Sequence, residues 1–131
     1  MALRATAADA YSYLGPAGTF TEAALAQVEA ARGAVWRPVH NIGEALDDVV
    51  DGTPVAAMLA IENTVEGGVA AVLDALATIP DLRIVGEYLV PVRFALLGRA
   101  GTSLADVQAI AAHPVAYAQC RGFLHLSLIH I

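Results

Sequence analysis

The sequence is poor in cysteine and in basic residues, and both shortages restrict what the protein can be. Its 131 residues include one cysteine, Cys120, which cannot form a disulfide within the chain, so a reducing compartment is expected. Only 7 residues are Lys or Arg, against 13 Asp or Glu, and no basic run is interleaved with aromatic residues. A net charge of -6 without such a run argues against a nucleic-acid partner.

Long apolar stretches and metal-ligand spacings are also missing. Gly, Pro, Asp or Glu interrupts every apolar stretch before about 18 residues, and the first ten residues lack the apolar core of a signal peptide. The four histidines form no cluster with Cys at ligand spacing, and no Ser-His-Asp arrangement is evident. We therefore expect a cytoplasmic, soluble protein that has no metal site and does not contact a membrane.

What the sequence does have is a hydrophobic share of 57%, distributed in the order typical of an α/β domain. Apolar runs predict strands at residues 11–14, 35–39 and 55–61. The third run is apolar throughout, which predicts a strand buried on both faces of a parallel sheet. Helical spacing predicts helices at about 20–31, from about 42 to the turn at Pro54, and at 69–77. The first two follow segments with the cap-x-x-Glu spacing of a capping box, Thr19 to Glu22 and Asn41 to Glu44.

The pattern changes after residue 81. Residues 82–97 are rich in strand formers but contain Pro91, which lacks an N–H group and should interrupt a central strand. We interpret this stretch as two strands that cross near Pro91, where a hinge leads into a second lobe. A strand at 107–111 and a helix from Pro114 to about Leu124 should follow. The apolar residues 125–131 contain no stop signal, and we interpret them as a non-native tail.

Two candidate ligand sites lie in the first half of the chain. Residues 15–20, with the letters GPAGTF, join a strand to a helix whose N–H groups suit a carboxylate or a phosphate. A simple turn with a helix cap explains the same letters. Residues 62–64, with the letters ENT, follow the apolar third strand, at the edge where α/β sheets bind ligands. A helix cap with a solvated Glu62 is the alternative there.

The third candidate site combines His113, which precedes Pro114, with Gln119. Histidine is often a general acid or base, and glutamine can orient a ligand through hydrogen bonds. A histidine in that position is also common as a cap or loop residue. Cys120 has no activating neighbour in the sequence and is interpreted as a small buried apolar residue.

Together these three segments resemble the prephenate dehydratase family. Residues 13–24 (YLGPAGTFTEAA) resemble its opening motif, residues 60–69 (AIENTVEGGV) its P-I-E-N-S-x-x-G-x-V segment, and residues 113–120 (HPVAYAQC) its S-H-P-Q-A-x-x-Q-C segment. Order and spacing agree from about Tyr11 to Leu124. The departures are Ala60 for Pro, Thr64 for Ser, Ala112 for Ser and Val115 for Gln, and they concern affinity more than identity.

The resemblance implies a fold similar to type II periplasmic binding proteins. Residues 10–124 would form an incomplete catalytic domain, with a first lobe at about 10–90 and the start of a second lobe at about 91–124. The implied activity is that of a carbon–oxygen lyase in phenylalanine biosynthesis, which converts prephenate to phenylpyruvate with loss of water and carbon dioxide and needs no cofactor. The resemblance also allows a homo-oligomer in a full-length protein.

The resemblance assigns substrate-binding residues by motif position. They are Gly18, Thr19, Phe20, Glu62, Asn63, Thr64, Gly67, His113 and Gln119. The family's catalytic threonine belongs to a Thr-Arg-Phe motif, which this sequence lacks, as it lacks the family's ACT domain. The catalytic residue is thus unassigned, and we expect the 131-residue chain alone to be inactive. Alternatives are a small-anion binding module of the solute-binding type, an arogenate dehydratase, and an inert fragment.

Overall fold

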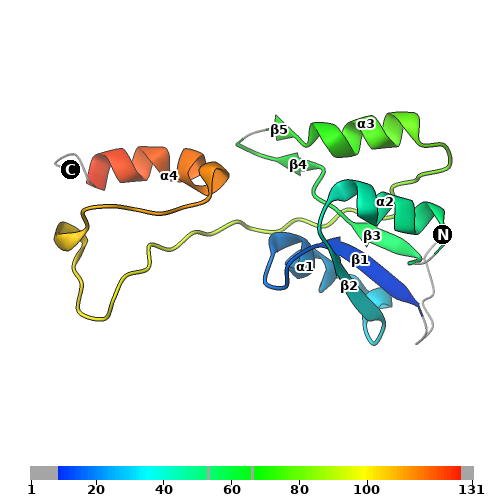
Figure 1. Cartoon of the computed structure of the whole chain (residues 1–131), viewed down its shortest axis with the longest axis horizontal. Coiled ribbons are helices and arrows are strands. Elements are labelled where there is room, and N and C mark those ends of the chain that lie inside the picture. The colour runs from blue at the N-terminus through cyan, green and yellow to red at the C-terminus, as the bar shows by residue number, and fades with distance from the viewer. Residues whose placement is uncertain (1–8, 53, 66, 128–131) are drawn as a thin grey trace. The chain divides into compact units, whose positions relative to one another are not determined.

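The structure is a computed structural model that describes residues 9–52, 54–65 and 67–127 (Figure 1). The chain divides into two compact units, Met1–Pro91 and Val92–Ile131. Among the described residues, no helix is both long enough and apolar enough to cross a membrane. Of the tail predicted at residues 125–131, residues 125–127 belong to the helix that begins at Pro114, and residues 128–131 lie outside the described residues.

The first unit is built on a parallel sheet of three strands. These are β1 (Ala10–Leu14), β2 (Val35–Val39) and β3 (Ala56–Met58), in the order β2-β1-β3. The central strand β1 pairs along its whole length with β2, and its Tyr13 lies opposite both Pro38 and Met58. The predicted parallel sheet and its first two strands are therefore confirmed.

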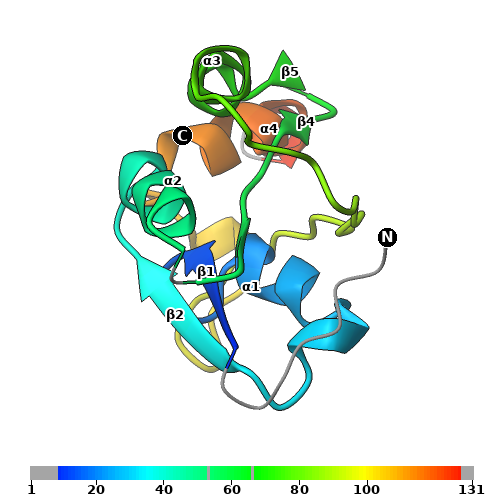
Figure 2. The same cartoon turned by 90° about the vertical axis from the view of Figure 1, so that its right-hand side faces the viewer.

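Helices connect these strands and cover the sheet. The β1–β2 connection contains α1 (Phe20–Leu25) and a 3-10 turn, η1 (Glu29–Ala31), while α2 (Ile42–Val50) connects β2 to β3. Figure 2 shows α1 and α2 on opposite sides of the sheet, as right-handed crossovers in opposite directions require. Because Val28 adopts an extended conformation, α1 ends well before the predicted residue 31.

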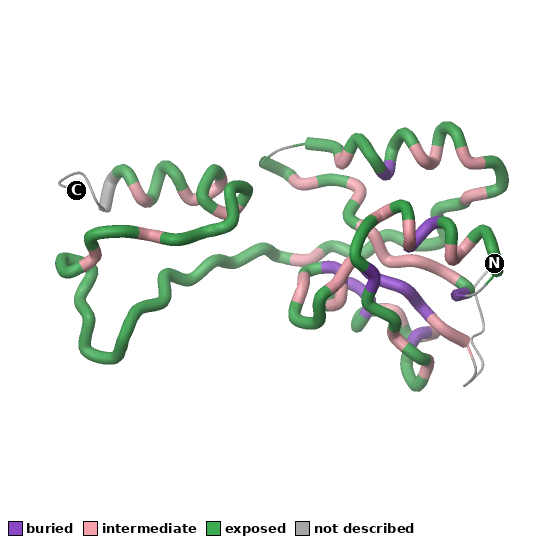
Figure 3. Tube along the Cα trace, in the orientation of Figure 1, coloured by how far each residue is buried: buried purple, intermediate pink, exposed green. Residues whose placement is uncertain are grey.

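The core of this unit lies between β1 and the first connection. Tyr11, Tyr13, Leu25 and Ala31 form one buried cluster, and β1 is the most continuously buried strand in Figure 3. The break at Val28 brings Ala31 into this cluster, where its carbonyl accepts a hydrogen bond of 2.9 Å from Trp36 Nε1. The side chains of alternate β1 residues face opposite ways, so Ser12 points toward the other face, which α2 covers.

The prediction of a long third strand buried on both faces is wrong. β3 comprises three half-buried residues and lies at the edge of the described sheet. After it the chain forms a hairpin of β4 (Glu62–Asn63) and β5 (Gly67–Gly68), which leads into α3 (Ala70–Thr78). A strand at the edge of a sheet has a pairing partner on one side only, which accounts for its partial exposure.

The predicted strands at 82–97 and 107–111 are not observed. The structure has neither helix nor strand at residues 82–97 and 107–111, and most of their side chains are exposed. Extended backbone becomes a strand only when its N–H and C=O groups pair with a neighbouring segment, and the described residues offer these stretches no such ladder. The apolar pattern alone could not reveal this.

The second unit contains a 3-10 turn and one helix. The turn is η2 (Leu104–Asp106), and the helix is α4 (Pro114–Ser127), whose predicted start at Pro114 is confirmed. The side chain of Asp106 accepts hydrogen bonds from the hydroxyl and the backbone N–H of Ser103, at 2.6 and 2.9 Å. These bonds lower the pKa of the Asp106 carboxyl below its ordinary value.

Candidate functional site

The carboxyl edge of the parallel sheet is the natural place for a ligand in the first unit. From the central strand β1 the chain passes through α1 to β2 on one side, and from β2 through α2 to β3 on the other. The loops that leave β1 and β3 therefore diverge at a topological switch point, where open α/β sheets bind ligands. Since Tyr13 lies opposite Met58, the segments that follow β1 and β3 begin side by side.

Glycines shape the loop of residues 15–19 that follows β1. The Gly15 N–H donates to the Val39 carbonyl at 2.9 Å, and a Cβ at Gly15 would lie 2.9 Å from Pro38 Cβ. Gly18 has a φ of +88°, a left-handed conformation that disfavours other residues. Glycine is therefore required for close packing at position 15 and for backbone conformation at position 18.

Two threonines attach this loop to the end of β1. The hydroxyls of Thr19 and Thr21 both donate to the Leu14 carbonyl, at 3.0 and 2.6 Å. Thr19 is also the N-cap of α1, where its hydroxyl oxygen accepts the Glu22 N–H at 3.4 Å. The interpretation of this segment as a turn with a helix cap is therefore correct as far as the fold goes, and the ligand interpretation stays a proposal.

The carboxylate of Glu22 has a different partner from the one that the motif predicts. In a capping box it would accept the N–H of Thr19, but its Oε2 accepts the Gly18 N–H at 2.6 Å, and its Oε1 accepts the Tyr13 hydroxyl at 3.2 Å. The Gly18 amide, which we predicted as a ligand donor, thus already has an anionic partner. The contribution of Gly18 that the structure supports is its left-handed backbone conformation.

The two tyrosines of β1 both have raised pKa values. Burial is the main reason why the pKa of Tyr13 exceeds its ordinary value of 10.0, followed by the charge of Glu22 and the hydrogen bond to it. Burial likewise raises the pKa of Tyr11, with smaller contributions from Asp9 and Tyr88. Both hydroxyls are therefore neutral near pH 7 and can donate hydrogen bonds.

The Glu62–Asn63–Thr64 segment lies in the β4–β5 hairpin, not directly at the end of β3. Its predicted position is wrong by the three residues between Met58 and Glu62. Asn63 is half-buried, and its Oδ1 accepts the Val65 N–H at 2.9 Å, which fixes the orientation of the side-chain amide. Gly67 has a φ of +85°, so glycine is required for the return strand.

The third candidate segment belongs to the second unit. The Nδ1 atom of His113 accepts the Val115 N–H at 3.3 Å at the start of α4, so this side chain caps the helix. Gln119 lies half-buried on the same helix, and the following Cys120 is a half-buried free thiol. The cap interpretation of His113 is thereby correct, and its contact with substrate stays a proposal.

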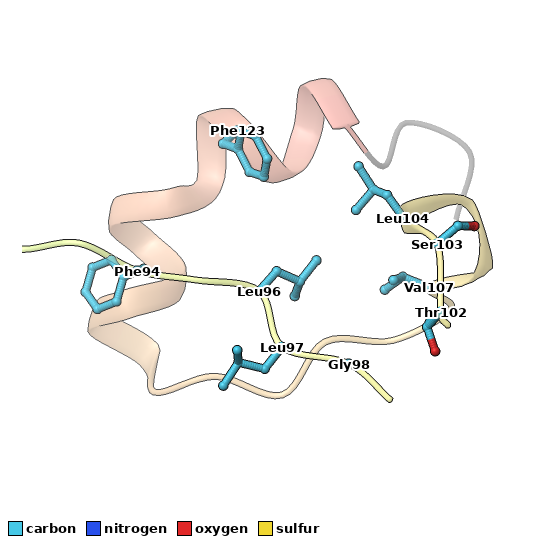
Figure 4. A pocket seen from close by; sticks show the side chains of 9 residues that line it. All are labelled: Phe94, Leu96, Leu97, Gly98, Thr102, Ser103, Leu104, Val107 and Phe123. Atoms are coloured by element: carbon cyan, nitrogen blue, oxygen red, sulfur yellow. The ribbon is translucent and has the colours of Figure 1, made fainter. Parts of the chain in front are cut away.

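Two cavities of the second unit contain none of the predicted site residues. One of about 330 Å³ lies among apolar side chains such as Phe94, Leu96 and Phe123 (Figure 4), and one of about 250 Å³ lies beside Val107 and Tyr117. Within residues 9–52, 54–65 and 67–127, no three His, Cys, Asp or Glu side chains gather as metal ligands.

Comparison with known proteins identifies the family. The model of the prephenate dehydratase family matches residues 11–131. The chain belongs to the prephenate dehydratase family. It is 40% identical to the prephenate dehydratase of Mycobacterium marinum, with 92% of this chain and 41% of that protein covered, and 42% identical to that of Corynebacterium glutamicum, with 86% and 38% covered.

A solved structure in the same family shares the fold. The prephenate dehydratase of Arthrobacter aurescens in complex with L-Phe is 50% identical, with a TM-score of 0.77 over 92% of this chain and 39% of that one. This chain thus spans about 40% of the length of these prephenate dehydratases. The α/β fold with a parallel sheet and helices is common to both.

Sequence reasoning missed one feature of the site, the link from Glu22 to Gly18 and Tyr13. The available signal was the Thr19-x-x-Glu22 spacing, which places a carboxylate within reach of several consecutive amides. The spacing does not say which amide the carboxylate selects. That depends on the path of the backbone before the cap, which turns the Gly18 N–H toward the carboxylate.

Proposed function

We propose that residues 10–124 form part of the catalytic domain of a prephenate dehydratase, a lyase that removes water and carbon dioxide from prephenate to give phenylpyruvate. Family membership over residues 11–131 supports this activity. The observation that carries the proposal is that the first two family motifs follow neighbouring strands, the first directly after β1 and the second three residues beyond the end of β3. A cytoplasmic location and a small-molecule substrate belong to the same proposal.

The finer fold that we propose is the two-lobed type II periplasmic-binding-protein architecture. The first unit would be the first lobe, and the second unit would begin the second lobe. The relative from Arthrobacter aurescens is in complex with L-Phe, and we propose that this chain likewise binds a small carboxylate with an aromatic ring or a ring that becomes aromatic. Thr19, Phe20, Glu62, Asn63, Thr64, His113 and Gln119 are the proposed substrate-binding residues, with Gly18 and Gly67 shaping their loops.

The chemistry asks little of the protein beyond positioning. Formation of an aromatic ring drives the reaction, so the protein has to orient the dianion and assist departure of the hydroxyl as water. Because the chain carries a net charge of -6, the dianion needs local hydrogen-bond donors. The Asn63 amide suits this task, since its Oδ1 is held by the Val65 N–H and its NH₂ group is thereby oriented.

The substitution Asn63→Ala tests the proposal directly. Isothermal titration calorimetry should show that the variant binds prephenate at least about tenfold more weakly, because one hydrogen bond to a charged group contributes ~1.5–3 kcal/mol. Asn41→Ala is the matched control, since Asn41 Oδ1 also accepts one backbone N–H at 2.9 Å, from Glu44.

The control should bind prephenate like the unaltered chain and lose only helix-cap stability, about 1 kcal/mol. Equal affinity of the Asn63→Ala variant and the unaltered chain would contradict the role of Asn63. A folded chain that binds no prephenate would contradict the proposed function.

A further inference from the structure

Glu22 and Glu44 occupy the same position relative to their helices. Each follows an N-cap residue by three positions, Thr19 in one case and Asn41 in the other. Each carboxylate accepts the backbone N–H of the residue before that cap, Gly18 at 2.6 Å and His40 at 2.9 Å. The chain therefore contains two copies of one capping arrangement, which can be compared directly.

The second oxygen distinguishes the two glutamates. Glu44 Oε1 lies 4.0 Å from the Arg37 guanidinium, whose side chain is half-exposed. Glu22 Oε1 instead accepts the hydroxyl of Tyr13, which is 3% exposed and belongs to the buried cluster of the central strand. An exposed ion pair contributes little, whereas a bond to a buried side chain connects the loop to the rigid core.

Their positions in the sheet also differ. Glu44 follows β2, an outer strand of the described sheet, whereas Glu22 follows the central strand β1, which has β3 as its other neighbour. Two hydrogen bonds, from Gly18 and from Tyr13, thus hold the 15–19 loop at the switch point. A carboxylate accepts both bonds as charge-assisted hydrogen bonds, whereas a carboxamide has a single acceptor oxygen and could meet the Tyr13 hydroxyl only as a donor, so both contacts would be neutral and weaker.

We propose that Glu22 is a positioning residue of the substrate site, which fixes the 15–19 loop through Gly18 and Tyr13 without contacting prephenate. This inference rests on the proposed function. The inference predicts the direction in which prephenate affinity changes when Glu22 is neutralised, because Glu22 affects the binding of a dianion in two opposite ways. Its negative charge repels the ligand, so neutralising it should favour binding. Weakening of its two hydrogen bonds should loosen the Gly18 end of the loop, which Gly15, Thr19 and Thr21 still attach to the sheet, and should oppose binding. A positioning role requires that the second effect prevail.

The test compares Glu22→Gln with Glu44→Gln in the full 131-residue chain. Both variants lose one negative charge and one capping carboxylate, but Glu22→Gln also weakens a bond to a buried side chain, so its melting temperature should fall more, and the Kd values are compared well below both melting temperatures. We expect the prephenate Kd to rise about tenfold for Glu22→Gln, about threefold for Tyr13→Phe, which removes one of the two bonds, and less than about twofold for Glu44→Gln. Hydrogen exchange of the Gly18 amide should accelerate in Glu22→Gln alone.

The outcomes separate this inference from the proposed function. If prephenate binds the unaltered chain and the two glutamine variants have equal Kd values, Glu22 is a structural cap and the inference is wrong. Tighter binding by Glu22→Gln would show that charge repulsion prevails and would overturn it as well. If the unaltered, folded chain binds no prephenate, the proposed function fails and the substrate role of Glu22 fails with it.

Discussion

At the scale of single residues, the bond between Tyr13 and Glu22 should be visible in the titration of Tyr13. Burial is the main cause of its raised pKa, and Glu22 adds to it through charge and a hydrogen bond. Glu22→Gln removes the charge and should lower the pKa of Tyr13, although burial keeps it above 10.0. The measurement is an NMR titration of the Tyr13 ring carbon that bears the hydroxyl.

Tyr11 is an internal control in that experiment, since Glu22 does not contribute to its raised pKa.

The raised pKa of Tyr13 also makes the free energy of unfolding depend on pH, in a direction that proton linkage gives. The folded chain holds the Tyr13 proton more tightly than the unfolded chain, so this contribution to stability is complete below pH 10 and declines as the pH rises through the folded pKa. An unchanged Tyr13 pKa in Glu22→Gln would contradict the contact.

The residue scale also shows what motif spacing can and cannot predict. The caps at Thr19 and Asn41 were predictable, because each type of side chain suits that position and the spacing to the glutamate is fixed. Each glutamate, however, bonds the amide one residue earlier than the capping box implies. The choice depends on the backbone conformation before the cap, which no spacing encodes.

At the scale of elements, the predictions succeeded where an element is specified locally. β1 and β2 are short segments rich in strand-forming residues and bounded by turns, and α2 has its own cap, so these elements could be predicted from their own sequences. Residues 82–97 have equally strong strand composition, but a strand also needs a neighbour, and pairing is a property of the surroundings.

The helix α1 gives an element-scale test of the core. Leu25 is 1% exposed, and Leu25→Ala should lower the free energy of unfolding by about 2–5 kcal/mol, because it leaves a cavity against Tyr11 and Tyr13. Leu73→Ala in α3 is the matched control, since Leu73 is 44% exposed, and it should cost less than about 1 kcal/mol. Chemical denaturation measures both, and equal losses would contradict this placement of the core.

At the scale of the whole molecule, the three motif segments are divided between the two units. The first two belong to the unit Met1–Pro91, and His113 and Gln119 belong to the unit Val92–Ile131. The family could be predicted from the sequence because the motifs occur in the family's order and spacing. Some polar atoms of the site form hydrogen bonds within the chain, among them the Gly18 amide and His113 Nδ1. These bonds could not be predicted from the sequence, because they depend on the folded backbone.

The central claim is that this chain supplies a working part of a prephenate dehydratase. The most direct test is a chimaera in which residues 11–124 replace the matching part of the 50% identical relative from Arthrobacter aurescens. Phenylpyruvate formation should stay within about tenfold of that relative, and Asn63→Ala in the chimaera should lower kcat/KM by at least about tenfold. A chimaera that melts cooperatively like the relative but forms no phenylpyruvate would contradict the claim.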